Sequence, residues 1–207
     1  MGKSADQHFS AMDLGRQLAP TYGEDKQGAT WGQTDKRTMI VAEDLSQDSL
    51  LDAMKKMRVY VTEDKALTMD VLASGFYMGA TTDTKQLNFD VNIESPNQAV
   101  SKVELLTNGA TVVLTDTPIT KNVNWKPAPI NVVGGQQWYV VRVTLANGDM
   151  AYSAPIWSPE EELSVKVSNV ESVGGAIIGN VPARLKAGIS NLGVKDVKSL
   201  VARFYYD

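Results

Sequence analysis

The residues of this chain that could do chemistry begin near its N-terminal end. Asp6-Gln7-His8 places a carboxylate two positions from the only histidine of the 207 residues. Such a pair can offer a divalent metal ion one carboxylate oxygen and one imidazole nitrogen. A hydrolytic metal site uses about three protein ligands and an open position for water. The chain has no cysteine, so the pair is either a chance arrangement or part of a metal site whose other ligands lie outside this sequence. We favour the second interpretation.

Other carboxylates of the N-terminal segment could complete a makeshift site, although nothing in their spacing indicates it. They are Asp13, Glu24, Asp25 and Asp35. A metal site takes its affinity from the number of its ligands and from a fixed surrounding shell. We therefore expect Asp6 and His8 to bind a metal ion weakly in this chain alone.

Composition and charge exclude several classes of function. The net charge is −4 and the pI is about 5.1, which argues against a nucleic-acid partner because phosphate binding needs a clustered basic surface. The sequence contains no apolar run near the roughly 20 residues that span a bilayer, so no membrane span is expected. The absence of cysteine fits a cytoplasmic protein or an exported bacterial one.

Residues 1–38 lack a sustained apolar period and are expected to be irregular. Residues 38–42 predict a strand, and Ser46 is expected to cap a helix that ends near Met57. Residues 58–62 predict a further strand. The helix should bury one apolar stripe, formed by Leu50, Leu51, Met54 and Met57.

Residues 66–158 change to a period of two and predict an antiparallel β-sandwich of about seven strands that folds independently. Asn108-Gly109 and Asn147-Gly148 are strong signals for tight hairpins. Residues 86–94 alternate without a fault, which predicts a single strand with one buried face. The positions expected in the core include Phe89, Val91, Leu105, Val140 and Ile156.

Aromatic residues in this segment allow two interpretations. They could form a platform for stacking on sugars, or they could be core and rim residues, and the alternation favours the core. Trp138 and Tyr139 are adjacent in a strand and point to opposite faces, so one of them is expected to be exposed. The residues concerned are Trp125, Trp138, Tyr139, Tyr152 and Trp157.

Residues 163–170, 181–190 and 197–206 predict three more strands, too few to close a second sandwich. Their apolar face needs a cover. We expect a second copy of the chain to provide it, as a homodimer through residues 163–207. The side chains of that face are Leu185, Ile189, Leu200 and Phe204.

Several motifs, kept in order over residues 1–158, resemble the polymerase-and-histidinol-phosphatase (PHP) family, in its CehA/McbA-like branch. They are Asp6-Gln7-His8, residues 57–64, Phe76-Tyr77-Met78-Gly79, residues 139–144 and Ala154-Pro155-Ile156-Trp157. The resemblance implies a distorted (β/α) barrel that holds two or three metal ions, followed by a small β-domain. Asp6 and His8 match the late Asp-x-His motif of that barrel, and the early histidine-rich motifs have no counterpart here.

This resemblance implies that the chain is the C-terminal accessory portion of a metal-dependent phosphoesterase or other ester hydrolase. The intact parent would use Mn²⁺, Zn²⁺ or Fe²⁺, held in part by Asp6 and His8, and the missing barrel would be a partner of this chain. The last 45 or so residues are similar to the start of a CARDB-like module of exported proteins, which favours an exported or cell-envelope bacterial protein. The alternative is a non-catalytic binding or adhesion module of such a protein.

The expected fold is mainly β. We predict a remnant of an α/β barrel over residues 1–65, an immunoglobulin-like antiparallel sandwich over residues 66–158 and an incomplete CARDB-like module over residues 159–207. The chain would then be cut at both ends. The sequence does not give the substrate, and it does not separate the hydrolase portion from the free-standing binding module.

Overall fold

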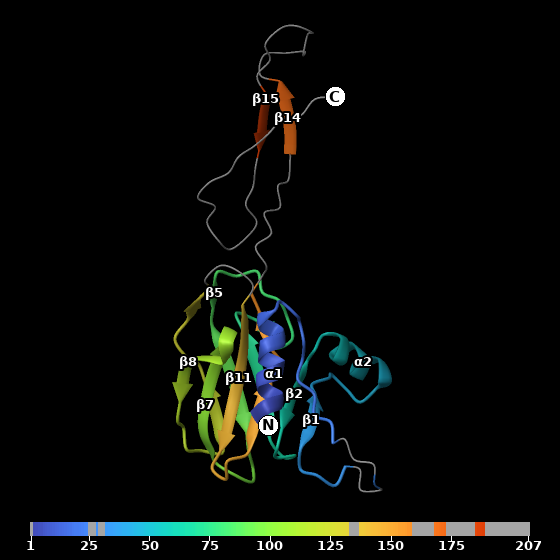
Figure 1. Ribbon diagram of the computed structural model, residues 1–207, viewed down its shortest axis with the longest axis vertical. Coiled ribbons are helices and arrows are strands. Elements are labelled where there is room, and N and C mark those ends of the chain that lie inside the picture. The colour runs from blue at the N-terminus through green and yellow to red at the C-terminus, as the bar shows by residue number, and fades with distance from the viewer. Residues whose placement is uncertain are drawn as a thin grey trace.

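Two antiparallel sheets face each other, and a helix lies on the outside of one of them (Figure 1). The structure is a computed structural model, and it describes residues 2–24, 28, 32–132, 137–158, 168–172 and 185–188. The elements, in chain order, are α1 (Gly2–Asp13), β1 (Arg37–Ile40), α2 (Gln47–Lys55), β2 (Val59–Thr62), β3 (Thr68–Ala73), β4 (Phe76–Tyr77), β5 (Gln86–Leu87), β6 (Phe89–Glu94), β7 (Val100–Thr107), the 3-10 turn η1 (Asn108–Ala110), β8 (Thr111–Asp116), β9 (Asn122–Trp125), β10 (Ile130–Asn131), β11 (Trp138–Leu145), β12 (Met150–Ser153), β13 (Ile156–Trp157), β14 (Ser168–Ser172) and β15 (Leu185–Gly188).

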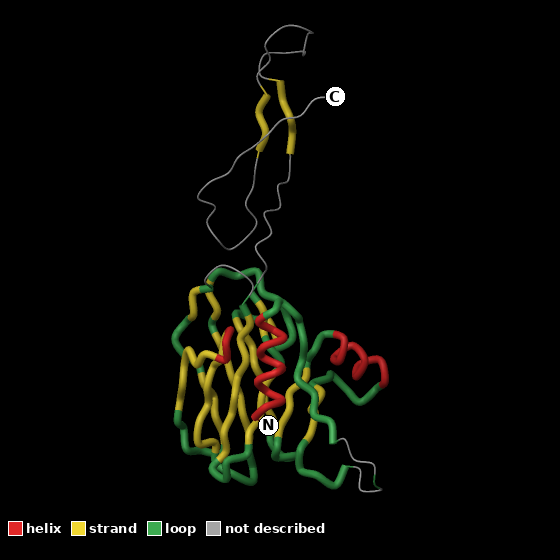
Figure 2. The backbone as a smooth tube through the Cα atoms, in the orientation of Figure 1, coloured by secondary structure: helices red, strands yellow, loops and turns green. Residues whose placement is uncertain are grey.

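The first sheet has the strand order β1-β2-β12-β11-β7-β8, with β13 also paired to β11. The second sheet has the order β4-β3-β6-β9, and β5 pairs with β10 in a short ladder. All pairings between named strands are antiparallel. The mainly β, antiparallel character expected from the alternation is therefore confirmed (Figure 2).

The core between the sheets follows the alternation of the strands. The five positions expected to be buried are at most 3% exposed: Phe89, Val91, Leu105, Val140 and Ile156. Val140 is buried on the opposite face of the first sheet, in the cluster under α1, and the other four belong to the core between the sheets. Residues 86–94 nevertheless form two strands instead of one. The backbone of Asn88 exchanges hydrogen bonds with Ser74, through the Ser74 hydroxyl (3.1 Å) and the Ser74 N–H (2.8 Å). This contact separates β5, which pairs with β10, from β6, which pairs with β3 and β9.

Both hairpins expected from Asn-Gly pairs are present. β7 pairs with β8 around Asn108-Gly109, and β11 pairs with β12 around Asn147-Gly148. Gly109 and Gly148 have φ of +68° and +90°, a region in which glycine has no steric penalty.

The expectation of an irregular N-terminal segment is wrong, because residues 2–13 form α1. Phe9 and Met12 face the first sheet from this helix and are 5% and 3% exposed. Short helices are marginal in water and take most of their stability from packing. The helix therefore depends on strands that lie far from it in the sequence, beyond the reach of a local pattern.

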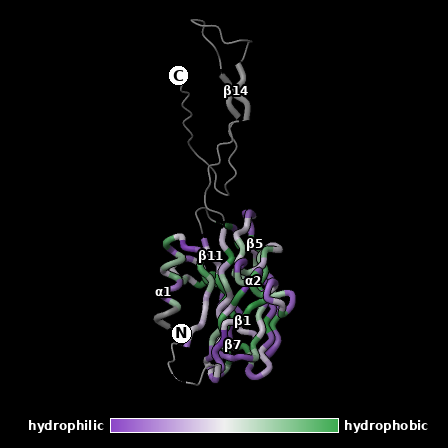
Figure 3. Tube along the Cα trace, turned by 90° about the vertical axis from the view of Figure 1, so that its right-hand side faces the viewer, coloured by the Kyte–Doolittle hydropathy of each residue, from purple (hydrophilic) through white to green (hydrophobic). Residues whose placement is uncertain are grey.

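α1 also explains why the prediction for Trp138 and Tyr139 is wrong. The two side chains do point to opposite faces, but Trp138 is 1% and Tyr139 is 2% exposed. Tyr139 belongs to the core between the sheets. Trp138 packs under α1, where the Phe9 ring stacks on it at 5.1 Å between centroids. Figure 3, turned by 90°, shows α1 outside the sandwich.

The boundary predicted at residue 65 follows directly after β2, a strand of the first sheet. β2 pairs with β12 on one side and with β1 on the other. Val59 and Tyr60 are buried in the same core as β6 and β11. The segment of residues 66–158 therefore lacks β1 and β2, which complete the first sheet, and α1, which covers it.

The helix expected after Ser46 is present as α2, and the Ser46 hydroxyl caps it by accepting from the Ser49 N–H at 3.2 Å. Its expected inward stripe is only partly buried. Leu51 and Met54 are 42% and 53% exposed, while Ala53 is 1% exposed. The sandwich thus covers a narrow strip of α2 and leaves much of its apolar side chain surface in solvent.

β14 and β15 pair with each other. β15 falls within the strand expected over residues 181–190, and β14 overlaps the end of the strand expected over residues 163–170. The third expected strand, together with Ile189, Leu200 and Phe204, lies outside the described residues. The homodimer through residues 163–207 stays a prediction. Neither of the two α-helices in the described part of the chain is long and apolar enough to cross a membrane.

Candidate functional site

A cavity of about 320 Å³ lies between α1, residues 19–23 and the outer face of the first sheet. Phe9, Val61 and Val140 supply apolar walls, and Ala5 lies on the helix side. His8 and Tyr22 add polar groups to the lining. The C-terminal end of α1 is held to the sheet by Asp13. Residues 19–23, which follow the helix, pass back over the sheet and form another wall of the cavity.

His8 is the polar residue of α1 that lines this cavity. Its Nε2 atom is buried and has no hydrogen-bond partner among the described residues. The imidazole ring lies edge-on to Phe9 at 6.1 Å between centroids. Burial lowers the pKa of His8 below its ordinary value, so the neutral imidazole dominates near neutral pH.

The helical geometry of α1 separates the two residues expected to bind a metal ion together. Residues two apart on a helix do not face each other. His8 lines the cavity, whereas Asp6 is exposed. The described residues contain no group of three or more His, Cys, Asp or Glu side chains placed to hold a metal ion. The role of Asp6 and His8 as metal ligands in an intact parent protein stays a prediction.

Two of the other carboxylates proposed for a makeshift site, Asp13 and Asp35, are engaged with other residues. Asp13 accepts hydrogen bonds from Trp138 and Gly109, and Asp35 forms an exposed ion pair with Lys65 at 3.0 Å. Asp25 lies outside the described residues. Glu24 is described and engages a partner of its own.

Asp13 fastens the end of α1 to the β7–β8 turn. One of its oxygens accepts from the buried Trp138 indole N–H at 2.8 Å, and the Gly109 N–H donates to the carboxylate at 3.1 Å. This carboxylate thus holds the helix end in register over the sheet.

We expect Asp13→Ala to lower the free energy of unfolding by about 2 kcal/mol, because a buried indole N–H loses its acceptor. Urea denaturation followed by circular dichroism measures this change. Asp6→Ala, at an exposed position of the same helix, should change it by less than about 0.5 kcal/mol. Equal effects of the two substitutions would contradict the anchoring role.

Lys36 and Glu63, at the rim of the cavity, form an ion pair with each other. Lys36 Nζ lies 2.8 Å from Glu63 Oε1 and 5.9 Å from the centre of the Tyr22 ring. The hydrogen bond that Lys36 donates to the Glu63 carboxylate is the main cause that raises the pKa of Lys36. Glu63 also accepts from the Met150 N–H at 3.0 Å. The cavity therefore offers no free cation of this pair to an anionic ligand.

A second charged cluster lies on the same outer face, with Glu104 at its centre. Arg142 Nε is 2.8 Å from Glu104 Oε2, and Lys102 Nζ is 3.1 Å from Glu104 Oε1. Burial on its own raises the pKa of Glu104, but the hydrogen bonds from Arg142 and Lys102 outweigh it and hold the pKa below its ordinary value of 4.5. All three side chains are engaged with one another, which indicates a structural role.

Because the pKa of Glu104 is lowered in the folded state, its ionised form stabilises the fold above about pH 4.5. This stability is lost as the pH falls through the lowered pKa. We expect Glu104→Gln to flatten the pH dependence of the unfolding free energy below about pH 4.5. Arg142→Met should weaken this pH dependence, since the larger of the two hydrogen bonds that lower the pKa of Glu104 is then lost while that from Lys102 remains. Urea titrations at several pH values measure both, and an unchanged profile in Glu104→Gln would contradict the assignment.

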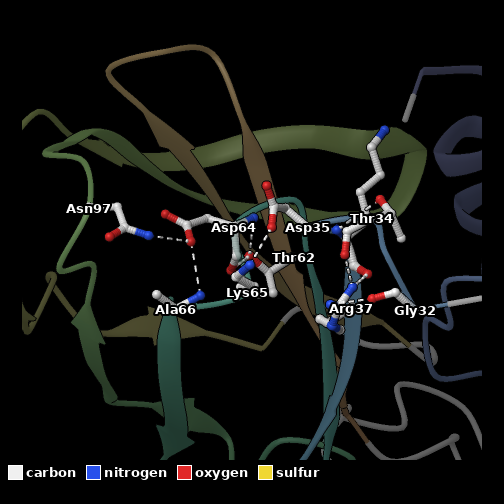
Figure 4. Close-up of polar contacts among 10 residues, drawn as sticks. Gly32, Thr34, Asp35, Arg37, Thr62, Asp64, Lys65, Ala66 and Asn97 are labelled. Atoms are coloured by element: carbon white, nitrogen blue, oxygen red, sulfur yellow. Dashed lines mark hydrogen bonds and ion pairs between the residues drawn. The ribbon is translucent and has the colours of Figure 1, made fainter.

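A third polar cluster lies at the ends of β1 and β2 (Figure 4). Asp64 Oδ1 accepts from the Ala66 N–H at 2.9 Å and from Asn97 Nδ2 at 3.1 Å. Thr62 Oγ1 donates to the Asp64 carbonyl at 2.9 Å. Arg37 donates to the carbonyls of Gly32, Thr34 and Lys36. These contacts close turns and leave no convergent group for a ligand.

The aromatic residues considered for sugar stacking are in the interior. Trp125, Trp138, Tyr139, Tyr152 and Trp157 are each at most 8% exposed, so the core interpretation of these five residues is confirmed.

Comparisons with known proteins do not assign the chain to a family. No family model matches it, and no curated protein matches it. One solved structure, an engineered protein from the Northeast Structural Genomics Consortium, is similar over 44% of this chain and 20% of its own, at 18% identity and a TM-score of 0.31. That score is too low to support an argument about fold or function.

Sequence reasoning singled out His8 but missed the cavity it lines. The available signal was the spacing of Ala5, Phe9 and Met12, which places three apolar side chains on one face of a helix. Polar and charged residues surround these three and weaken the periodic pattern over the short segment. The opposite wall is formed by β2, β11 and β12, which no local pattern connects to residue 8.

Proposed function

We propose that this chain is the C-terminal, non-catalytic portion of a PHP-type metal-dependent phosphoesterase or hydrolase. Its immunoglobulin-like β-sandwich would pack against the catalytic barrel of the parent. The observation that carries the proposal is an unpartnered apolar surface on and beside α2. The ordered series of motifs that resembles the PHP family supplies the identity of the partner.

The α2 surface consists of Ile40, Leu45, Leu51 and Met54, which are 39%, 92%, 42% and 53% exposed. Exposed apolar side chains that gather in one region mark interaction sites on soluble proteins. In Figure 1, α2 stands to the side of the sandwich, beyond β1 and β2. Ala53 is the fully buried residue of α2, so the helix has room for a second partner on its exposed side.

The divergence of Asp6 and His8 on α1 leads us to expect an inactive chain. The chain by itself should not hydrolyse phosphomonoesters or phosphodiesters in Mn²⁺, Zn²⁺ or Fe²⁺, because a hydrolytic site needs at least three convergent ligands. Release of phosphate or of a chromogenic leaving group measures this. Metal-dependent activity that disappears in His8→Ala would contradict the expectation.

The docking role is tested by restoring the polypeptide encoded upstream of Met1. We expect the joined protein to hydrolyse phosphoesters, and Leu51→Ser with Met54→Ser to weaken the packing of the sandwich on the upstream domain. Gln47→Ser with Lys55→Ser, on the same helix but outside the α2 surface, is the matched control. Limited proteolysis between the two parts reports the packing separately from activity. Equal protection from proteolysis in the two double variants would contradict the proposal.

The alternative function is a non-catalytic binding or adhesion module of an exported bacterial protein. The cavity beneath α1 favours it, since a binding module needs a site within its own chain. The joined protein distinguishes the two functions, because a free-standing binding module would gain no hydrolytic activity when upstream sequence is added.

A further inference from the structure

We propose that Asn147 is a site of spontaneous deamidation, which converts its side-chain amide to the carboxylate of aspartate or isoaspartate, and that Asp13 protects Asn108 from the same reaction. Asn147-Gly148 and Asn108-Gly109 are the two Asn-Gly pairs of the sequence. The difference between them arises from tertiary contacts. It is independent of the proposed accessory role and involves neither a metal ion nor the α2 surface.

The reaction joins the asparagine side chain to the backbone nitrogen of the following residue. The Gly148 nitrogen loses its proton and bonds to the side-chain carbonyl carbon of Asn147, and the bond from that carbon to Nδ2 breaks. The proton passes through water to the released nitrogen, which leaves as ammonia. Water then opens the resulting cyclic imide at either carbonyl, which gives aspartate or isoaspartate. Glycine in the second position has no side chain to obstruct the attack.

The hydrogen bonds around Asn147 stay within its own turn. The Gly148 N–H donates to the Leu145 carbonyl at 2.9 Å. The Asn147 side chain accepts from the Asp149 N–H at 3.1 Å and donates to the Asp149 carboxylate at 2.6 Å. Asn147 and Gly148 are exposed. This turn can therefore open locally and bring the reacting atoms together without disturbing the packing of the sheets.

At Asn108 both reacting groups are held by distant parts of the chain. The Gly109 N–H donates to both oxygens of the Asp13 carboxylate at 3.1 Å, and a hydrogen bond to a charged acceptor is about twice as strong as one between neutral groups. The Asn108 Oδ1 atom accepts from the Trp138 N–H at 3.2 Å. Asp13 is fixed in turn by the Trp138 indole. Attack at this pair therefore requires the end of α1 to separate from the sheet.

The product changes the end of the β11–β12 hairpin. The new carboxylate replaces an amide that donates to Asp149, so an attractive contact becomes a repulsion between two negative charges. Isoaspartate also adds a methylene group to the main chain, in a turn whose length sets the pairing of its strands. The modified chain carries one carboxylate more than the original, which has a net charge of −4, and anion exchange separates the two forms.

Incubation of the folded chain at neutral pH, followed by mass spectrometry of tryptic peptides, measures both rates in one experiment. Asn108 and Asn147 fall in different tryptic peptides, residues 103–121 and 143–166. We expect Asn147 to react at least about tenfold faster than Asn108, the factor for one charged hydrogen bond that must break at Asn108. In urea the two rates should become equal, because unfolding removes the protecting contacts.

Two variants test the role of the Asp13 carboxylate. Asp13→Asn removes its charge with little change of shape and should raise the rate at Asn108 about fivefold. Asp6→Asn makes the same exchange at an exposed position of α1 and should leave both rates unchanged. Near-ultraviolet circular dichroism checks that both variants keep the Trp138 packing. An unchanged rate at Asn108 in Asp13→Asn, or equal rates at the two pairs in the folded wild-type chain, would overturn the proposal.

Discussion

Replacing Gly79 with alanine is expected to lower the free energy of unfolding by about 4 kcal/mol, a larger effect than other exchanges of one methyl group in this chain. A Cβ atom at this position would lie 2.2 Å from the carbonyl oxygen of Lys56 and 2.6 Å from that of Met57. These are backbone atoms, so no side-chain rotation relieves the clash. Gly79 also has φ of +92°, which alanine adopts only with strain.

The position of Gly79 does not allow it to move away. Its N–H donates to the Pro155 carbonyl at 2.9 Å on one side, and the end of α2 lies against it on the other. Any shift therefore disturbs either the link to β13 or the turn that leads from α2 into β2. Thermal unfolding should show a loss of about 10 °C.

Gly148→Ala is the matched control for this prediction. Gly148 has nearly the same φ, +90°, but nothing lies within 4 Å of an added Cβ. It should lose about 1 kcal/mol through backbone strain alone. The difference between the two variants in urea denaturation isolates the close approach of backbone to backbone. Equal losses would show that Gly79 is needed only for its dihedral angle.

The second large effect is expected for Phe9→Ala, which should remove about 3–4 kcal/mol. The Phe9 ring stacks on Trp138 at 5.1 Å with an interplanar angle of 10° and is tilted against Tyr152 at 6.0 Å. It is 5% exposed. Alanine would leave a void under α1 and would expose the outer face of the first sheet to water.

Leu14→Ala provides the control near the same helix, since Leu14 is 80% exposed. It should change stability by less than about 0.5 kcal/mol. Urea denaturation measures both variants, and near-ultraviolet circular dichroism reports the Trp138 environment. A Phe9→Ala variant as stable as Leu14→Ala would show that α1 does not pack on the sheet in solution. The cavity beneath α1 would then lose one wall.

Local chemistry made much of the sheet structure predictable. Asn108-Gly109 and Asn147-Gly148 set tight turns, and the strict alternation of Phe89, Val91 and Ile93 fixed which face is buried. Ser46 marked the start of α2 through its capping side chain. These signals act within a few residues of one another, so the sequence alone contains them.

The sequence of α2 and its neighbours did not determine which side chains of this helix are buried. Its stripe of Leu50, Leu51, Met54 and Met57 has the period of a packed helix. Such a period shows that the helix could pack on a partner, but it does not show which side chains become buried. The sandwich covers Ala53 and leaves Leu51 and Met54 exposed. The position of Gly79 under the end of α2 fixes this placement from a different part of the chain.

The candidate site shows the same division between sequence and tertiary structure. The sequence by itself determined that this chain has one histidine beside a carboxylate and two sheets with a common core. Only tertiary structure decided that residues 2–13 fold as a helix, because Phe9 and Met12 gain their burial from β7, β11 and β12. That helix exposes Asp6 and makes His8 part of the lining of a cavity. A short helix is marginal without such packing, so the surroundings of His8 depend on strands that lie far from it in the sequence.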